Sequence, residues 1–372
     1  MGLTEVESKV FELITNNDLY GLKNHLTLNE IKIDILDDHG MTPLTHACFK
    51  GNYEISQYLL DQGADVNTSE HEHRYSALHF AALSGNAKLC KLLLDAGAKS
   101  HWVNSVGRTA PQMAAFVGNH QCVAVINNYI PKSEVDYYTV PVGLEKEPKL
   151  QPELAAALHK LVMQVNLHPV RIALNLLPTL YEESPSVKWV LELMSQKEMN
   201  RGSESNEVTS FKLHYFSHIV GEVIKNKPPV QERQQTMNKS QAFTKRILKP
   251  GSGEKYLDTV IVESIREFPF RESTLFRQMV SSLASGKDAP SPFSVIVTAI
   301  NGQRGFTDNV KCCATCTEEN ATKTCSSCKK TYYCDKDCQR LHWFVHKKAC
   351  NKVTEDSINV CDQLENMNVS HD

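Results

Sequence analysis

The sequence predicts a mainly α-helical protein in three parts: a solenoid of stacked helix pairs, a helical middle region and a small C-terminal finger that folds around two zinc ions. Three observations support this prediction. Similar segments recur every 33 or 34 residues near the N-terminus, and apolar residues recur at helical spacing through the middle. Eight of the twelve cysteines fall between residues 312 and 350.

The composition is that of a chain with several globular domains. Its 372 residues, of which 41% are hydrophobic, suffice for two or three domains. A formal net charge of −3 gives no strong field of either sign, which argues against non-specific binding to nucleic acid or to an anionic membrane. We therefore expect protein partners that are recognised by shape and by specific contacts.

The N-terminus and the cysteine distribution predict a cytoplasmic protein without membrane insertion. The first residues, MGLTEVESKV, lack the basic and apolar stretches of a secretion signal, and no apolar run is long enough to span a membrane. The cysteines cluster near the C-terminus, and none occurs between residues 123 and 311. This clustering favours metal binding in a reducing compartment over disulfide bonds.

Three segments between residues 40 and 130 share one pattern: MTPLTHACFKGN, YSALHFAALSGN and RTAPQMAAFVGN. Thr42-Pro43-Leu44 is a typical cap and start of a helix, a small alanine lets neighbouring helices approach closely, and the closing glycine ends the helix. The pattern resembles the ankyrin repeat, whose helix pairs bury their apolar faces only against one another. We expect residues 1–130 to hold three clear repeats and a degenerate N-terminal cap over residues 5–34.

The loops between the repeats are predicted to project as fingers beside a concave surface. His71-Glu72-His73 lies in the second finger and has a metal site as one alternative, but we interpret it as a solvated loop tip. We interpret His46 and His79 as structural. The predicted partner contacts in the fingers are Asp38, His39, His71, His73, Arg74 and Asn104 to Val106.

Four prolines mark a linker over residues 131–152. Beyond it, residues 153–310 are predicted to form a helical region of unknown role. Leu154, Leu158, Leu161 and Val162 recur there at helical spacing, as do apolar residues farther along. Residues 351–372 are polar and are predicted to be a disordered tail.

The C-terminal segment 313–350 holds four closely spaced ligand pairs: Cys313-x2-Cys316, Cys325-x2-Cys328, Cys334-x3-Cys338 and His346-x3-Cys350. Short spacings let two side chains of one turn reach the same tetrahedral ion, and eight ligands complete two closed sites. Each structural zinc contributes about 10 kcal/mol or more to folding, so two ions replace the core that so small a module lacks. No ligand position is left for catalysis.

Spacing alone leaves two alternatives among these ligands. Cys312 could replace Cys313, and His342, one helical turn earlier, could replace His346. The Cys-x2-Cys pattern favours Cys313, and the x3 spacing to Cys350 on one helix face favours His346.

The order of the ligands is six cysteines, a histidine and a cysteine. A RING finger carries its histidine fourth and a PHD finger carries it fifth, so this segment resembles a MYND finger. The resemblance implies interleaved pairs, with one zinc at Cys313, Cys316, Cys334 and Cys338 and the other at Cys325, Cys328, His346 and Cys350. It also implies docking of short proline-containing peptides beside a tryptophan, at the positions of Gln339 and Trp343.

Ankyrin repeats, a helical region and a C-terminal MYND finger occur in this order in the ankyrin repeat and MYND domain-containing proteins, which the chain resembles. The stretches NSVGRTAPQMAAFVGNH, DYYTVPVGLEKEPKL and HWFVHKKAC carry the resemblance. It implies a non-enzymatic adaptor that helps to traffic signalling proteins to the cilium and affects Hedgehog signalling. The implied partners are ciliary signalling proteins, chaperones or peptidyl-prolyl isomerase-type proteins.

MYND fingers also occur in SET-domain lysine methyltransferases, which makes an enzyme one alternative. The sequence contains no SET-type Asn-His-Ser-Cys stretch, no Walker phosphate loop and no Gly-x-Ser-x-Gly elbow, so we predict that the protein is not an enzyme. A transcriptional corepressor-docking scaffold that acts through the finger is the remaining alternative.

Overall fold

The computed structural model describes residues 3–68, 70–176, 179–226, 241–286, 289–302 and 310–350. The chain divides into two compact units, and the predicted mainly α-helical class is confirmed. Unit 1 consists of Met1–Pro131 with Ile300–Gly305, and unit 2 of Lys132–Ala299 with Phe306–Asp372. The tail expected at 351–372 lies outside the described residues.

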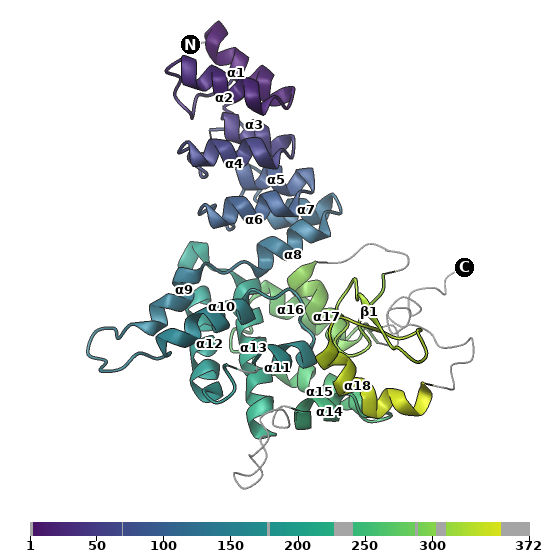
Figure 1. The fold of residues 1–372 in the computed structure, drawn as a ribbon. Helices are drawn as coiled ribbons and strands as arrows, with labels where there is room; N and C mark the ends of the chain where they lie inside the picture. Colours follow the sequence, from purple (N-terminus) through teal and green to yellow (C-terminus); the bar gives the residue numbers. More distant parts are fainter. Residues whose placement is uncertain are drawn as a thin grey trace. The chain divides into compact units, whose positions relative to one another are not determined.

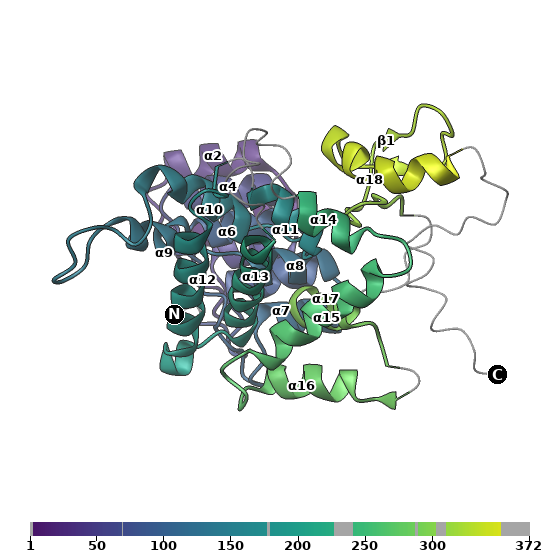
Figure 2. The ribbon, with the colours of Figure 1, turned by 90° about the horizontal axis from the view of Figure 1, so that it is seen from below.

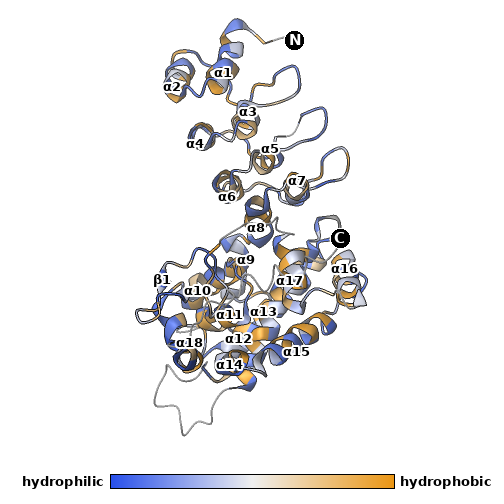
Figure 3. Ribbon diagram, turned by 90° about the vertical axis from the view of Figure 1, so that its right-hand side faces the viewer, coloured by the Kyte–Doolittle hydropathy of each residue, from blue (hydrophilic) through white to orange (hydrophobic). Residues whose placement is uncertain are grey.

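Unit 1 is built from antiparallel helix pairs that stack on one another (Figure 1). Figure 3 shows these helices nearly end-on, with the loops between successive pairs on one side and hydrophobic residues where helices meet. The ankyrin solenoid predicted from the repeats is confirmed. The pairs are α1 (Glu5–Thr15) with α2 (Leu19–Leu28), α3 (Pro43–Phe49) with α4 (Tyr53–Asp61), α5 (Ala77–Ser84) with α6 (Ala87–Asp95), and α7 (Ala110–Phe116) with α8 (His120–Asn128).

The repeated residues have the local roles that their chemistry predicts. Thr42 caps α3 by accepting a hydrogen bond from the Thr45 amide at 3.2 Å, and Pro43 takes the first helical position. Ala47 is completely buried between helices. Gly51 has φ of +69°, a conformation that glycine adopts without steric cost, and it ends the helix.

The asparagine that follows each closing glycine connects neighbouring repeats. The side-chain amide of Asn86 donates to the Gly51 carbonyl at 2.9 Å, while its oxygen accepts from the Leu89 amide and caps α6. One repeat later, Asn119 donates to the carbonyls of Ala82 and Leu83. The recurrence of Gly-Asn therefore reflects a bond between repeats as well as a helix cap.

The two histidines that we interpreted as structural also hold loops in place. His79 is fully buried, and its Nε2 lies 3.0 Å from the Arg108 carbonyl of the next repeat. His46 Nε2 lies 2.7 Å from the Asp37 carboxylate. Burial raises the pKa of Asp37, but hydrogen bonds from His46 and from the Met41 and His39 amides lower it by more than burial raises it. The pKa of Asp37 therefore lies below its ordinary value.

Unit 2 contains the helical middle region and the finger, and the predicted helical character of the middle region is confirmed. Its long helix α13 (Glu207–Lys225) packs against α12 (Ser184–Met199), α11 (Pro169–Leu176) and α15 (Gly253–Arg266), as Figure 2 shows from below. Phe211, Tyr215, Phe216 and Ile219 of α13 are completely buried and form part of the core. The other helical elements are α9 (Lys132–Asp136), η1 (Tyr137–Thr139), η2 (Pro152–Leu154), α10 (Ala155–Val162), η3 (Gly202–Glu204), α14 (Gln241–Ile247), α16 (Thr274–Leu283) and α17 (Pro292–Asn301).

The start of the expected linker is folded into unit 2. Residues 132–139 form α9 and η1, and the side chains of Val135 and Tyr138 are buried. The Glu134 carboxylate lies 2.8 Å both from Lys197 Nζ and from Arg201 Nη2. Proline is tolerated just before a helix, so Pro131 marks the beginning of α9 and not the beginning of an unstructured segment.

The finger consists of a two-stranded antiparallel ladder and one helix. Strand β1 (Lys323–Thr324) pairs with β2 (Tyr332–Tyr333), and α18 (Lys336–Ala349) follows. Asp335 caps α18 by accepting from the Cys338 amide at 2.7 Å. Within the described ranges, none of the helices has the length and apolar character needed to cross a bilayer.

Candidate functional site

The first group of metal ligands consists of four cysteines whose sulfur atoms all lie within 4.8 Å of one another: Cys313, Cys316, Cys334 and Cys338. Cys334 Sγ lies 3.6 Å from Cys313 Sγ, 3.7 Å from Cys316 Sγ and 3.4 Å from Cys338 Sγ. A Zn–S bond of about 2.3 Å places the sulfurs of a tetrahedral site about 3.8 Å apart. The four thiol groups therefore fit one zinc ion.

The second group brings together Cys325, Cys328, His346 and Cys350. Cys325 Sγ lies 3.7 Å from Cys350 Sγ, and Cys328 Sγ lies 3.5 Å from His346 Nε2. Three sulfurs and one imidazole nitrogen at these separations fit a second tetrahedral zinc. Two structural zinc ions thus match the donor chemistry of the finger.

The structure also separates the alternatives that spacing left open. Cys313 belongs to the first group, and Cys312 does not. His346 belongs to the second group, whereas His342 Nδ1 lies 3.0 Å from the Tyr333 hydroxyl. In each group, two pairs that are separated by another pair in the sequence come together.

Tight turns in the backbone direct the cysteine pairs toward the ions. Thr317 and Lys329 each follow the second cysteine of a Cys-x2-Cys pair, and both have positive φ, of 54° and 56°. Positive φ is uncommon for residues other than glycine, and here it reverses the chain directly after the ligands. Burial raises the pKa of Cys328, but hydrogen bonds from backbone amides of Lys330 and Thr331 help to lower it to about 6, which favours the zinc-binding thiolate.

Arg171 of the middle region contacts the first ligand group. Its Nη1 donates to Asp335 Oδ2 at 3.1 Å, and its Nη2 lies 2.5 Å from Cys334 Sγ. Burial opposes the charge of Arg171, but nearby thiolates raise the pKa of its guanidinium above the ordinary value. Four thiolates around Zn²⁺ carry a net charge of −2, so this guanidinium offsets charge and orients a ligand.

A second contact reinforces this attachment. The side-chain amide of Asn166 donates to the Cys316 carbonyl at 3.0 Å. Both Asn166 and Arg171 lie far from the finger in sequence, and our sequence analysis did not identify them. Arg171 is a polar residue on the mostly apolar α11, and Asn166 lies in the loop before that helix. Neither feature indicates a metal ligand as the partner.

Gln339 and Trp343, the residues predicted to bind peptide, lie one turn apart on α18 and therefore share a face. The ring of Trp343 lies 6.0 Å from the ring of His346, so it covers part of the second ligand group. Trp343 is nevertheless 46% exposed, and Gln339 is half-buried. An aromatic side chain that remains accessible on a rigid zinc module is suited to binding a partner.

The candidate contacts in the second finger of the solenoid differ in accessibility. His73 is exposed, but the ring of His71 packs 5.4 Å from the ring of Phe80, and burial lowers the pKa of His71. Arg74 has φ of +57° and lies over the ring of Trp102. Among the described residues, no metal-type cluster includes either histidine.

Asn104 was wrongly predicted as a contact residue. It is only 2% exposed, and its Oδ1 accepts hydrogen bonds from the amides of Val106 and Arg108. The side chain thus satisfies the turn of its own loop, a common use of asparagine. Val106, in contrast, is 71% exposed and remains available to a partner.

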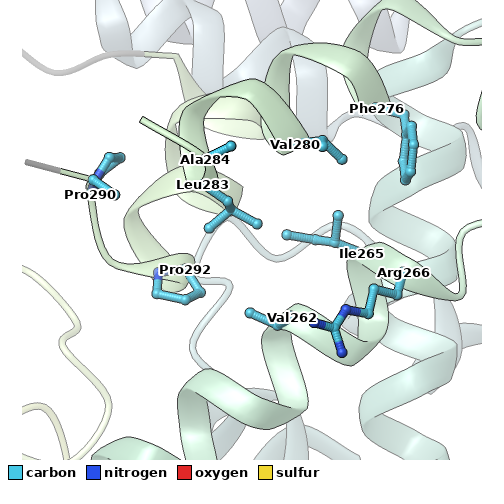
Figure 4. A pocket seen from close by; sticks show the side chains of 10 residues that line it. Val262, Ile265, Arg266, Phe276, Val280, Leu283, Ala284, Pro290 and Pro292 are labelled. Atoms are coloured by element: carbon cyan, nitrogen blue, oxygen red, sulfur yellow. The ribbon is translucent and has the colours of Figure 1, made fainter. Parts of the chain in front are cut away.

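An apolar hollow of about 480 Å³ lies between α15, α16 and the start of α17 (Figure 4). Ile265, Phe276, Val280 and Leu283 point into it, and Arg266 lies at its side. Sequence analysis did not find this surface because its lining comes from helices whose mutual packing the apolar pattern does not specify.

Comparisons with known proteins assign both ends of the chain. An ankyrin-repeat model with three copies matches residues 12–104, and a MYND-finger model matches residues 313–350. The chain is 31% identical over 358 residues to Dauer abnormal formation protein 25 of Caenorhabditis elegans. The aligned residues cover 93% of this chain and 90% of that protein. This alignment includes the middle region as well as the two modules.

Two other similarities are local. The chain is 33% identical over 109 residues to the E3 ubiquitin-protein ligase hecd-1 of Caenorhabditis elegans, covering 29% of this chain and 4% of that protein. It is 46% identical over 52 residues to the Zinc finger MYND domain-containing protein 10 homolog of Drosophila melanogaster, covering 14% of this chain and 11% of that protein. Such short matches indicate shared modules and not a shared overall organisation.

Proposed function

Because this chain belongs to the family of ankyrin-repeat and MYND-finger proteins that includes Dauer abnormal formation protein 25, we propose that it is a non-enzymatic adaptor that helps to traffic signalling proteins to the cilium. Both modules are protein-interaction modules. In this proposal, residues 1–130 bind one partner and residues 313–350 bind another. Two binding sites on one chain raise the effective concentration of one partner near the other.

The observation that carries the proposal is the presence of two different surfaces suited to partners. The solenoid presents exposed residues at its loop tips, such as His73 and Val106, beside stacked helices. The zinc finger presents Trp343 on a helix that metal ligands hold in place. We propose that client proteins bind the solenoid and that a peptide segment of a second protein binds the finger.

We further propose the identity of the zinc ligands and their role. Cys313, Cys316, Cys334 and Cys338 hold the first ion, and the second group holds the other. Each ion then has four protein ligands and no open position for water or substrate, as in structural zinc sites. Closed zinc sites support a function in binding and not in catalysis.

The ciliary role and an effect on Hedgehog signalling rest on the family resemblance. The partners that it suggests are ciliary signalling proteins, chaperones or peptidyl-prolyl isomerase-type proteins. A corepressor-docking scaffold is the second candidate, because the exposed Trp343 beside Gln339 would also suit a proline-containing peptide from a nuclear protein.

Quantitative affinity capture of the full chain from ciliated cells tests the proposal. Three substitutions are compared with the unaltered chain: Val106→Asp in a solenoid loop, His73→Ala in another, and Trp343→Ala in the finger. We expect the loop substitutions to reduce capture of membrane signalling proteins and Trp343→Ala to reduce capture of a different set of proteins.

Two matched controls separate docking from damage to the fold. Trp189 on α12 is 48% exposed, like Trp343, so Trp189→Ala removes a similar ring elsewhere in unit 2. Lys88 is exposed on α6, away from the loops, and Lys88→Ala serves the solenoid. If only nuclear corepressors were lost, and only with Trp343→Ala, the trafficking proposal would be wrong and the scaffold alternative would replace it.

A further inference from the structure

Helices α13 and α15 face each other with a group of metal-type side chains that the zinc finger does not use. One ring nitrogen of His218 and one carboxylate oxygen each from Glu222 and Glu263 lie within 4.8 Å of one another. His218 and Glu222 are four residues apart on α13, and so share one face of that helix. Glu263 comes from α15, so the group bridges two packed helices.

The two nitrogens of His218 have different environments. Nδ1 lies 2.9 Å from Oε2 of Glu267, which follows the last residue of α15, one turn beyond Glu263. Nε2 is buried and has no hydrogen-bond partner, and the side chain as a whole is only 6% exposed. A buried nitrogen without a partner costs free energy, so binding of a ligand at Nε2 would be favourable.

The hydrogen bond to Glu267 determines which ligand suits this nitrogen. When Nδ1–H donates to a carboxylate, the neutral imidazole presents the Nε2 lone pair, the arrangement found in histidines that bind metals. Glu267 is 63% exposed and can therefore hold the ring from the solvent side. In this arrangement Nε2 suits a ligand that accepts a lone pair, such as a metal ion.

The local charge favours a cation. Three carboxylates, those of Glu222, Glu263 and Glu267, surround His218. The cations near them are Lys225, whose Nζ lies 2.7 Å from Glu222 Oε1, and Arg246, which stacks on the Tyr256 ring. The side chain of Lys225 is 69% exposed, so water screens this ion pair and a metal can compete with it. Tyr256 donates to Glu222 Oε2 at 3.1 Å, which holds that carboxylate without neutralising it.

We infer that His218, Glu222 and Glu263 form a third metal site, which binds a divalent transition ion through one imidazole and two carboxylates. Nitrogen and oxygen donors of this kind suit zinc, manganese, iron or cobalt, in contrast to the sulfur-rich sites of the finger. Helix bundles commonly place metal ligands on facing helices in this way. The bound ion would fix α13 to α15 at a distance from both finger sites.

Cobalt titration of the full chain, with zinc already in both finger sites, tests this inference. Cobalt bound by nitrogen and oxygen gives weak visible bands, whereas cobalt that replaces finger zinc adds intense thiolate bands in the near ultraviolet. We expect one equivalent of cobalt to bind with the weak bands alone and to raise the melting temperature of unit 2.

Two substitutions remove ligands and one serves as the matched control. Glu263→Gln keeps the shape of a side chain that makes no hydrogen bond within the described part of the chain, so the fold should persist while the cobalt affinity falls at least about tenfold. His218→Gln should have the same effect. Glu254→Gln changes an exposed carboxylate on the same helix and should leave cobalt binding unchanged.

Far-ultraviolet circular dichroism and a finger zinc content of two ions confirm that each variant is folded. The inference is overturned if the unaltered chain binds no further cobalt at millimolar concentration. It is equally overturned if cobalt binds but the affinity is the same in Glu263→Gln and His218→Gln.

Discussion

Arg171 on α11 donates a hydrogen bond to Asp335 at 3.1 Å, although 164 residues separate them. Asp335 also caps α18 through the Cys338 amide, and Cys338 is a ligand of the first group. One carboxylate therefore links the middle region, the helix start and the metal site. These contacts attach the finger to α11 within unit 2.

Removing this arginine should loosen the first zinc. Arg171→Met keeps much of the side-chain volume but removes the contacts to Asp335 and Cys334. Groups that orient metal ligands typically contribute a factor of about 10 to 100 in metal affinity, so we expect zinc to transfer to a colorimetric chelator about tenfold faster.

Arg277 provides the matched control for this experiment. It is 67% exposed and pairs with Glu272, which is itself 92% exposed, so the pair contributes little to stability. Arg277→Met should leave the transfer rate unchanged. Equal rates in Arg171→Met and in the unaltered chain would contradict the role assigned to Arg171.

Removing zinc should expose the finger cysteines selectively. We expect a strong chelator to make the seven cysteines of the two ligand groups reactive toward an alkylating reagent, because the finger unfolds without its ions. Cys48, Cys90 and Cys122 are completely buried in unit 1 and should stay protected. Burial raises the pKa of Cys48 to about 12, which keeps it in the less reactive thiol form.

Mass-spectrometric mapping of the alkylated cysteines checks this prediction. Urea serves as the positive control, since it should expose the cysteines of unit 1 as well. Protection of the finger cysteines after complete removal of zinc would show that the finger folds without metal.

The gathering of cysteine and histidine side chains in the finger was predictable because each pair lies within five residues and the ligand chemistry is restricted to few residue types. The solenoid was predictable because its period appears directly in the sequence. Arg171 and the group around His218 were not, because their partners come from distant segments and an amphipathic stripe does not specify which helix it meets. Asn104 was misjudged because a polar residue in a loop can be satisfied by the loop itself.

The bond between repeats should contribute measurably to the stability of unit 1. Asn86→Ala removes both a helix cap and the bond to the Gly51 carbonyl, so we expect a loss of about 2 kcal/mol. Asn86→Asp keeps the capping oxygen and removes only the donor, so the loss should be about 1 kcal/mol.

Hydrogen exchange of the amides in α5 and α6 in increasing urea measures both losses. Asn67, which lies in a loop and bonds to the Gly97 carbonyl at 3.1 Å, allows a comparison in an exposed setting. Equal losses in Asn86→Asp and Asn86→Ala would mean that the helix cap contributes nothing measurable. Our assignment of about 1 kcal/mol to the bond between repeats would then be wrong.

Lys212 should make the stability of unit 2 depend on pH. It is completely buried on α13, and burial lowers the pKa of its ammonium group well below the usual value. In the pH range between the pKa of Lys212 in the folded chain and its pKa of about 10.4 in the unfolded chain, the unfolded chain binds more protons than the folded chain. The stability of the unaltered chain therefore rises with pH in that window, by up to about 1.4 kcal/mol per pH unit.

Lys212→Met removes this titration, so its stability relative to the unaltered chain should fall as the pH rises from 7 towards 10. Urea unfolding at several pH values, followed by hydrogen exchange in α13, measures the difference. Lys225→Met is the control, because Glu222 raises the pKa of Lys225 and places its titration above this range. Parallel pH profiles for Lys212→Met and the unaltered chain would refute the prediction.

The attachment of the finger to α11 also has a consequence for biosynthesis. The ribosome completes α11 long before it makes the first cysteine pair, so Arg171 and Asn166 are already in place when the finger emerges. The finger can then bind metal only after the residues that attach it have been made. A cell short of zinc would accumulate molecules with a finished solenoid and an unfolded finger.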